Sequence, residues 1–548
     1  MSHKQGIAPF KDYYGNIVSD DAGKANILNV NFSQMCTIDD GKIPLPIIDY
    51  NNNIVPSLSS FSCINFDEHF IFKVIDKLDG NCSPGPDDFR SILLKCLKHV
   101  ICYPLSILFT RMFNFGDVPN DWKKAIVKPI FKKGSASDPN NYRPISLTSV
   151  VCKVFETIIK NQLLDYLNEN SLLSREQHGF LSKHSTTTNL LESLNDWTSS
   201  WDKHLVTKIL YMDFEKAFNC VSVPKLLCKL ERLGINGNLL LCIKSFLTGR
   251  SQCVSIATHK SAYLPIVSGV PQGSVLGPIL FLLYINDLPN IFCDGIVAKL
   301  FADDLKSYNV FDYRSNPPSM QNAVDALLGW CSSWQLNLSS PKCGSLLLQG
   351  NSNFRDSETI LMGNEELKTL KTVSDLGVVI DANLSFSPHI NIVVVKAKQR
   401  LFLLFKAFHS RNITLFVFAF KVYILPILEY CSPIWSPHKL CDIDKLENVQ
   451  RYFTKRLTGL WDVAYKQRLL KCGLFSLELR RLHIDLILCY TILNNLTCFK
   501  ITDFFELETN PRTRGHNFKL RIPKCRTSLK QHFFLSGSFR LGTPFPTI

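Results

Sequence analysis

Residues 300–308 read LFADDLKSY, and the adjacent carboxylates Asp303 and Asp304 within this stretch decide the fold. Successive side chains of a strand point to opposite faces, so two neighbouring carboxylates can serve one site only at the tip of a tight hairpin. The apolar residues on both sides predict such a hairpin. A third carboxylate, Asp213, ends the apolar run ILYMDF at 209–214. Carboxylates at the ends of strands suit a Mg²⁺ site, because Mg²⁺ prefers oxygen ligands. The alternative reading of an adjacent Asp pair alone is a pair of solvated turn residues.

Short strands and helices alternate around these residues. The pattern predicts strands at 209–214, 253–257 and 298–302, and helices at 67–78, 92–115, 223–233, 239–247 and 277–288. This interleaving predicts an α+β fold with a sheet covered on one face. The first 64 residues predict an irregular lead-in, whereas the chain after Leu384 is almost wholly helical in pattern, beginning with 393–409.

Composition and charge narrow the class of protein. The 548 residues are 46% hydrophobic and 20% charged, which is typical of a globular protein. Residues 386–548 hold 25 Lys and Arg against 10 Asp and Glu, within a net charge of +14 for the whole chain. This local surplus favours a polyanionic partner, and solvated helix faces are the alternative reading.

Cysteine usage and hydropathy bear on the compartment. The 19 cysteines form no CxxC pair, which argues against a zinc finger or a disulfide scaffold and indicates a reducing compartment. No secretory signal is visible, and the apolar stretch Leu415–Trp435 contains Lys421 and Glu429, which predicts a buried helix rather than a membrane span. We therefore expect an intracellular protein of the cytoplasm or nucleus with no membrane partner.

Three segments in order carry a resemblance to a known family. YMDFEKAFNCV at 211–221, SGVPQGSVLGPILFLLYINDLP at 268–289 and LFADDLKSY resemble the palm motifs of reverse transcriptases from non-LTR (LINE-type) retrotransposons. The jockey-like branch is the most similar, since SPGPD, WKKAIVKPIFKKG, NYRPISLTSVVCKVFE and QHGF stand upstream. CSSWQLNLSSPKC at 331–343 and VSDLGVVIDANLSFSPHI at 373–390 follow downstream, so that the resemblance spans roughly residues 65 to 530.

The resemblance implies a right-hand polymerase fold and an RNA-directed DNA polymerase activity. Fingers and palm would occupy 65–385, with core motifs at 111–385, and a helical thumb with a basic C-terminal region would occupy 386–548. The implied partners are an RNA template, a DNA primer or target DNA, and dNTPs. Asp213 and Asp303 would be the principal ligands of two Mg²⁺ ions, for which Mn²⁺ is a possible substitute, and Asp304 would complete the triad.

The same resemblance implies further site residues. The nucleotide-binding set would be Lys132, Lys133, Arg143, Lys216, Ala217, Phe218, Gln272 and Gly273. The ring of Phe218 would exclude a ribose 2′-hydroxyl, although a core aromatic is the alternative. Either of the two lysines could hold the triphosphate, and either could be a solvated loop charge.

The remaining implied residues concern the primer and the leaving group. Lys342 falls where polymerases can place a general acid for pyrophosphate, and a surface lysine is an equal alternative. Leu376 and Gly377 fall in the primer-gripping hairpin. Lys396 and Arg400 lie on the predicted basic helix of the thumb, which would follow the nucleic-acid backbone.

The sequence departs from the family pattern in three places. Asn219 stands where the family usually has Asp, which is expected to weaken a local hydrogen bond. The ending at 533–548 differs from the usual one, and no endonuclease is recognisable before residue 65, so a separate endonuclease is an expected partner. A catalytically silent nucleic-acid-binding remnant is therefore the alternative function. An RNA-dependent RNA polymerase is a third reading, against which Phe218 argues.

Overall fold

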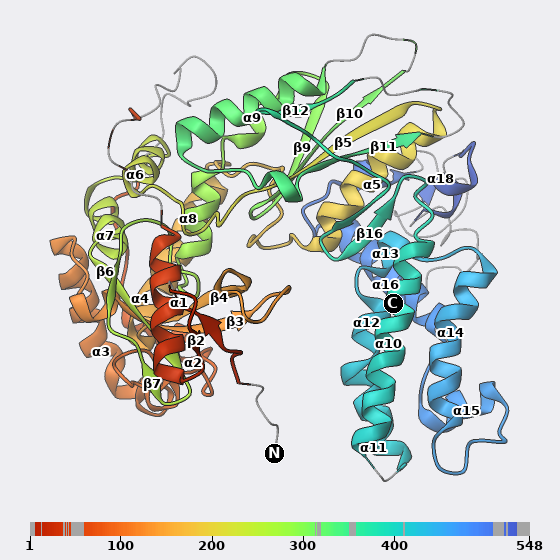
Figure 1. Ribbon diagram of the computed structural model, residues 1–548, viewed down its shortest axis with the longest axis horizontal. Coiled ribbons are helices and arrows are strands. Elements are labelled where there is room, and N and C mark those ends of the chain that lie inside the picture. The colour runs from red at the N-terminus through yellow and green to blue at the C-terminus, as the bar shows by residue number, and fades with distance from the viewer. Residues whose placement is uncertain are drawn as a thin grey trace. The chain divides into compact units, whose positions relative to one another are not determined.

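The structure is a computed structural model that describes residues 6–12, 14–36, 39, 41, 43–44, 60–312, 314, 319–349, 354, 358–408, 411–507, 520–521 and 524–533 (Figure 1). It forms two compact units that interleave along the sequence. The first unit takes Met1–Phe180, Asp213–Ile291 and Asp325–Ser339, and the second takes Leu181–Met212, Phe292–Val324 and Ser340–Ile548. Each unit therefore gathers segments that are distant in the sequence.

The first unit contains a five-stranded sheet. β3 (Lys124–Phe131) pairs antiparallel with β4 (Tyr142–Leu147) and parallel with β6 (Arg250–Ile256). β7 (His259–Lys260) and β8 (Leu264–Ile266) both pair with β6. The strand predicted at 253–257 is confirmed as part of β6.

A helix near the N-terminus covers this sheet, so the irregular lead-in predicted for residues 1–64 is wrong in this part. α1 (Asp21–Gln34) begins after Asp20, whose carboxylate accepts a hydrogen bond from the backbone three residues on. Ala25, Leu28 and Phe32 are buried together with residues of β3, β4 and β6, and Figure 1 shows the helix running along the strands. Their spacing of three and four is helical and was the available signal. The part of the lead-in at 45–59 lies outside the described residues.

Most of the other helices of the first unit lie close to the ranges that were predicted for them. They are α2 (Glu68–Asp76), α3 (Ser91–Phe115), α4 (Val150–Glu169), α6 (Val223–Arg232), α7 (Gly237–Leu247) and α8 (Gly277–Tyr284). α9 (Met320–Trp334) has its later part in this unit. α8 ends before the predicted residue 288, where a 3₁₀ turn (Leu288–Ile291) follows instead. Within the described residues, α3 is the helix whose length and composition alone would allow it to cross a membrane.

The second unit contains another five-stranded sheet, with the order β14-β11-β5-β10-β9. The strands are β5 (Val206–Asp213), β9 (Ile296–Phe301), β10 (Asp304–Phe311), β11 (Gly344–Gln349) and β14 (Thr369–Leu370). Residues 206–212 of β5 are all buried, as expected for a central strand. The helix α5 (Thr186–Asp202) packs against β9 and β11. The strands predicted at 209–214 and 298–302 are thus confirmed.

Helices make up most of the second unit after residue 386. They are α10 (Ser387–Ala407), α11 (Ile413–Tyr423), α12 (Leu425–Glu429), α13 (Ser432–Trp435), α14 (Leu440–Lys455), α15 (Tyr465–Cys472), α16 (Leu477–Leu493), α17 (Ile501–Phe504) and α18 (Ser528–His532). The single buried helix predicted at Leu415–Trp435 is wrong, because this stretch is divided among α11, α12 and α13. Pro426 and Pro433 stand in the first turns of the latter two, where proline is tolerated while it interrupts the preceding helix. His409, the last residue of the helix predicted at 393–409, lies outside the described residues, as does 534–548 of the unusual ending.

Small two-stranded ribbons complete the described architecture. They are β1–β2 (Phe10–Lys11, Ile17–Val18), β12–β13 (Leu361–Met362, Glu365–Glu366), β15–β16 (Thr372–Asp375, Val378–Asp381) and β17–β18 (Glu506–Leu507, Leu520–Arg521). The predicted α+β class is confirmed. The predicted linear boundary at 385/386 does not separate the two units, since the sheet around β5 shares a unit with residues 386–548. The assignment of fingers, palm and thumb stays a prediction.

Candidate functional site

Asp303 and Asp304 lie at the tip of a hairpin, as predicted. β9 and β10 pair antiparallel with Asp304 opposite Phe301, which leaves Ala302 and Asp303 as the two-residue connection. Ala302 has a positive φ of 54°, a conformation that tight hairpin turns require. Asp303 is half-buried and Asp304 is exposed. The hairpin therefore brings two adjacent carboxylates to one end of the sheet.

Asp213 is the last residue of β5, and β5 is the hydrogen-bonded neighbour of β10 in the sheet order. Its backbone carbonyl accepts a hydrogen bond from the N–H of Ser339 at 2.8 Å. Asp213 belongs to the first unit, whereas Asp303 and Asp304 belong to the second. The convergence of the three carboxyl groups stays a prediction.

Within the first unit, the segment after Asp213 is hydrogen-bonded to the PQG turn. The amide of Gln272 donates to the side-chain oxygen of Asn219 at 3.3 Å, and the N–H of Val270 donates to the carbonyl of Phe218 at 2.8 Å. The carbonyl of Gln272 accepts from the N–H of Ser146 on β4 at 2.7 Å. The structure thus places two of the motifs and β4 side by side. The long hydrogen bond to Asn219 is the one that an Asp would strengthen by its charge.

Replacing Gly273 by any other residue would force the backbone of β4 to move. Its φ is +114°, and a Cβ there would stand 2.3 Å from the carbonyl oxygen of Ser146. Only glycine allows this conformation and this close approach. The turn therefore needs glycine at this position, whereas its contact with a nucleotide stays a prediction.

Phe218 has features of a core aromatic residue and of a residue that is accessible to a nucleotide. Its ring stacks on Phe281 of α8 with centroids 4.3 Å apart and meets Phe180 edge-on at 6.3 Å. The side chain nevertheless stays half-exposed. Before it, Ala217 is buried and Lys216 is exposed with a positive φ of 49°. The role of Phe218 against a sugar and the roles of the two preceding amides stay predictions.

The basic residues predicted to hold a triphosphate share the β3–β4 hairpin. Lys132 and Lys133 follow the end of β3, and the N–H of Lys132 donates to the carbonyl of Asn141 at 2.8 Å. Arg143 lies on β4 opposite Ile130. All three side chains are exposed.

Glu156 is a buried residue that sequence reasoning missed. It lies on α4, and one of its carboxylate oxygens accepts hydrogen bonds from the N–H groups of Val275 and Leu276 at 2.7 and 2.9 Å. Burial raises the pKa of Glu156, whereas these two amides favour its ionised form. The carboxylate therefore anchors the segment between the PQG turn and α8. The available signal was an acidic residue at helical spacing from the apolar residues Cys152 and Ile159.

In the second unit, the predicted primer-grip hairpin is confirmed as a hairpin. β15 and β16 pair antiparallel with Asp375 opposite Val378, so Leu376 and Gly377 form the turn. Lys342 is exposed on a short 3₁₀ helix (Ser340–Lys342) before β11. Its predicted role as a general acid, and the contact of the turn with a primer, stay predictions.

The predicted basic amphipathic helix is α10. Val393, Ala397 and Leu401 are buried on one side, whereas Lys396 and Arg400 are exposed one turn apart on another. The apolar side packs into the core of the second unit. The exposed pair is thus free to approach a polyanion along one edge of the helix.

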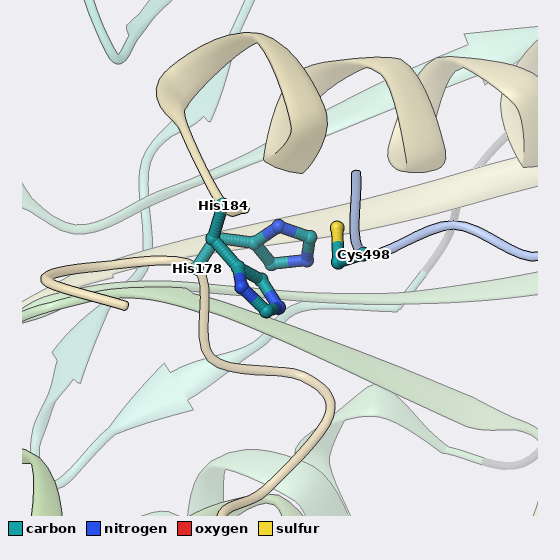
Figure 2. Close-up of side chains that lie close together, drawn as sticks. All are labelled: His178, His184 and Cys498. Atoms are coloured by element: carbon teal, nitrogen blue, oxygen red, sulfur yellow. The ribbon is translucent and has the colours of Figure 1, made fainter. Parts of the chain in front are cut away.

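His184 and Cys498 lie close together in the second unit, and Figure 2 shows them with His178, a residue of the first unit. The ligand atoms of His184 and Cys498 are within 4.8 Å of one another. Burial raises the pKa of the Cys498 thiol to about 11, which opposes the thiolate that zinc requires. A structural zinc ion also takes four ligands. This pair therefore does not define a metal site.

Comparison with known proteins finds a family whose model matches the part of the chain that carries this site. Residues 130–380 match the family model described as "Reverse transcriptase (RNA-dependent DNA polymerase)". Residues 130–380 therefore carry the sequence pattern of the reverse transcriptase family. The candidate carboxylates, the PQG turn and the β15–β16 turn all fall within the matched range.

Individual relatives of the chain come from mobile elements of Drosophila. The chain is 26% identical over 400 residues to the RNA-directed DNA polymerase from mobile element jockey of Drosophila melanogaster, which covers 70% of this chain and 43% of the relative. It is 25% identical over 404 residues to the probable RNA-directed DNA polymerase from transposon X-element of the same organism, covering 71% and 43%. The chain thus spans less than half the length of these curated relatives. A structure of apo telomerase from Candida tropicalis, truncated from its C-terminal domain, matches with a TM-score of 0.35 and 13% identity, covering 53% of this chain and 60% of that one.

Proposed function

We propose that the chain is the RNA-directed DNA polymerase of a non-LTR retrotransposon, which extends a primer 3′-hydroxyl by nucleotidyl transfer. The observation that supports it most is the Asp303–Asp304 tip of the β9–β10 hairpin. β10 is the neighbour of β5 in the sheet, and β5 ends in Asp213. These residues fall within the match to the reverse transcriptase family. Fingers, palm and thumb of a right-hand polymerase complete the proposal.

Asp213, Asp303 and Asp304 are the proposed ligands of two Mg²⁺ ions, with Mn²⁺ as a possible substitute. Their carboxylates are hard oxygen donors at strand ends and are at most half-buried, so they suit a cation that keeps part of its water and shares phosphate oxygens. When bound, the two ions would activate the primer hydroxyl and neutralise charge on the departing pyrophosphate. The chain's own task is to hold three negative charges in place.

Binding of the incoming dNTP is assigned to residues of the first unit. Lys132 or Lys133 and Arg143 attract the triphosphate from one hairpin, and the amides of Lys216 and Ala217 approach it. The ring of Phe218, fixed by stacking on α8, would collide with a ribose 2′-hydroxyl and so select deoxynucleotides. Gln272 supports this segment through its hydrogen bonds to Asn219 and β4, and Gly273 allows the close approach of the turn to β4.

The template, primer and leaving group involve the second unit. Leu376 and Gly377 support the primer end, Lys342 protonates the pyrophosphate, and Lys396 and Arg400 contact the backbone of the RNA–DNA duplex. A nicking endonuclease is a further proposed partner, because it supplies the primer end on target DNA. Action in the cytoplasm or nucleus belongs to the same proposal.

Primer extension on poly(rA)/oligo(dT) with Mg²⁺ and dTTP tests this function. We expect incorporation by the wild type and a loss of about 100-fold or more in Asp303→Asn, because the isosteric amide removes one ligand charge and preserves the shape. Equal melting temperatures of the two proteins control for folding. Duplex binding without incorporation by the wild type would instead support a silent nucleic-acid-binding remnant.

The choice of sugar is tested in the same assay with UTP in place of dTTP. We expect dTTP to be strongly preferred, because Phe218 leaves no room for a 2′-hydroxyl. Equal or better use of UTP would support an RNA-dependent RNA polymerase instead.

A further inference from the structure

The turn at Leu376 and Gly377 is conformationally restricted by its own backbone. Both residues have positive φ values, 45° and 86°. A two-residue turn with both angles positive matches the twist of the flanking strands β15 and β16 and joins them tightly. The orientation of the turn's backbone groups toward a ligand is therefore fixed once the hairpin itself is held in place.

A buried ion pair holds this hairpin against the sheet that carries Asp304. The ammonium group of Lys306 on β10 lies 2.7 Å from a carboxylate oxygen of Asp375, and their side chains are 4% and 7% exposed. Asp375 directly precedes the turn, and Lys306 lies two residues after Asp304, on the same face of the strand. Burial lowers the pKa of Lys306, and the charge of Asp375 opposes this shift. The two charges are thus buried at the expense of their hydration, and their mutual contact offsets part of this cost.

The carboxylate of Asp375 also reaches β5. Burial, followed by the negative charge of Asp375, raises the pKa of Tyr211, which lies two residues before the end of that strand. The charge of Asp375 is therefore close enough to act on Tyr211 of β5 as well as on Lys306 of β10.

A tyrosine from the helical region holds the turn from another side. The hydroxyl of Tyr430 donates to the carbonyl of Leu376 at 2.8 Å. Its ring lies over Gly377 so closely that a Cβ there would come within 3.2 Å of a ring carbon. The indole N–H of Trp435 in turn donates to the backbone carbonyl of Tyr430 at 2.8 Å. This hydrogen bond fixes the position of the Tyr430 backbone.

We infer that Lys306 and Tyr430 are positioning residues that fix the Leu376–Gly377 turn, and through it the primer 3′ end, relative to Asp304. This inference rests on the proposed polymerase function. Lys306 acts through the carboxylate of Asp375, and Tyr430 acts through the carbonyl of Leu376. Neither touches the reacting atoms. Their effect is on geometry, and a displacement of about 1 Å is enough to slow an in-line attack severely.

Tyr430→Phe tests the helical side of this arrangement, because it removes only the hydroxyl of a half-exposed side chain. We expect the single-turnover rate of first-nucleotide incorporation to fall about three- to tenfold, the effect of one lost hydrogen bond. The dissociation constant of the primer–template and the melting temperature should stay at wild-type values. Tyr423→Phe on α11 is the matched control, because it removes the hydroxyl of an exposed tyrosine that belongs to another segment than the turn.

A second readout reports the primer end without relying on chemistry. A primer with 2-aminopurine at its 3′ terminus should fluoresce more strongly in complex with Tyr430→Phe than with the wild type or Tyr423→Phe, because a mobile terminal base stacks less. A purely structural role of Tyr430 would leave this signal unchanged. Wild-type rate and wild-type fluorescence in Tyr430→Phe would overturn the inference.

The sheet side needs a variant that keeps the core intact. Lys306→Met alone would strand the buried charge of Asp375, whereas the double variant Lys306→Met/Asp375→Leu replaces the pair by apolar groups, which cores often accept. We expect the double variant to melt near the wild-type temperature yet to lose incorporation rate and gain fluorescence. Lys306→Arg, which keeps the charge, should recover most of the rate. A double variant with wild-type kinetics overturns the role of Lys306, and a wild type that binds duplex but incorporates nothing overturns the polymerase function itself.

Discussion

Asp485 shows at the residue scale how a buried charge makes stability depend on pH. It lies on α16 with 7% of its surface exposed, and burial raises its pKa from 3.8 to about 7. Between pH 4 and 7 the folded state therefore binds a proton that the unfolded chain releases. Since the folded state binds more protons in this window, the free energy of unfolding falls as pH rises through it and stays low above pH 7.

We therefore expect Asp485→Asn to stabilise the protein at pH 8 by an amount on the order of 2–4 kcal/mol and to have little effect near pH 4. Thermal melting of the variant and the wild type across this range measures the difference. Asp444→Asn, at an exposed position of α14, is the control. Parallel melting profiles for wild type and Asp485→Asn would contradict the prediction.

At the scale of elements, Glu156 of α4 holds the chain that leads into α8. Glu156→Leu would leave the N–H groups of Val275 and Leu276 buried without an acceptor. We expect this change to lower the free energy of unfolding by about 2–5 kcal/mol. Glu156→Gln should cost less, because its amide oxygen still accepts. Urea unfolding measures both variants, and a Leu variant as stable as the Gln variant would show that the two amides find other partners.

Local patterns in the sequence predicted most elements and missed their assembly. The helical spacing of α2 and α3, and the apolar runs of β5 and β9, depend on neighbours in sequence and were predicted. The hairpin tip at Asp303 followed from two adjacent carboxylates between apolar residues. In contrast, the grouping of β5 with β11 and with the helices after 386 depends on pairings between distant segments. For the same reason, Glu156 and the Lys306–Asp375 pair were not foreseen: their partners are far away in the chain.

At the scale of the whole molecule, the basic surplus of residues 386–548 predicts salt-dependent binding to nucleic acid. Replacing Lys396 and Arg400 of α10 by Ala should weaken binding of an RNA–DNA duplex and reduce the slope of log K against log salt by about 1–2, because up to two phosphate contacts disappear. Fluorescence anisotropy at several KCl concentrations measures the slope. Lys73→Ala/Lys77→Ala is the control pair, exposed at the same spacing on α2 and its end in the first unit. An equal change of slope in both double variants would contradict a specific role of α10 in binding nucleic acid.

The order of strands in the sheet around β5 also bears on how the protein can be made. During synthesis β5 leaves the ribosome long before β11, and β14 follows later still, yet β5 lies between β11 and β10 in the finished sheet. A nascent chain that stops short of residue 344 therefore exposes one long edge of β5, a strand that is buried from 206 to 212 in the folded protein, and this edge invites aggregation. Expression of truncated fragments should fail for this reason, and a chaperone that shields the edge of β5 until β11 emerges would raise the yield of the intact chain.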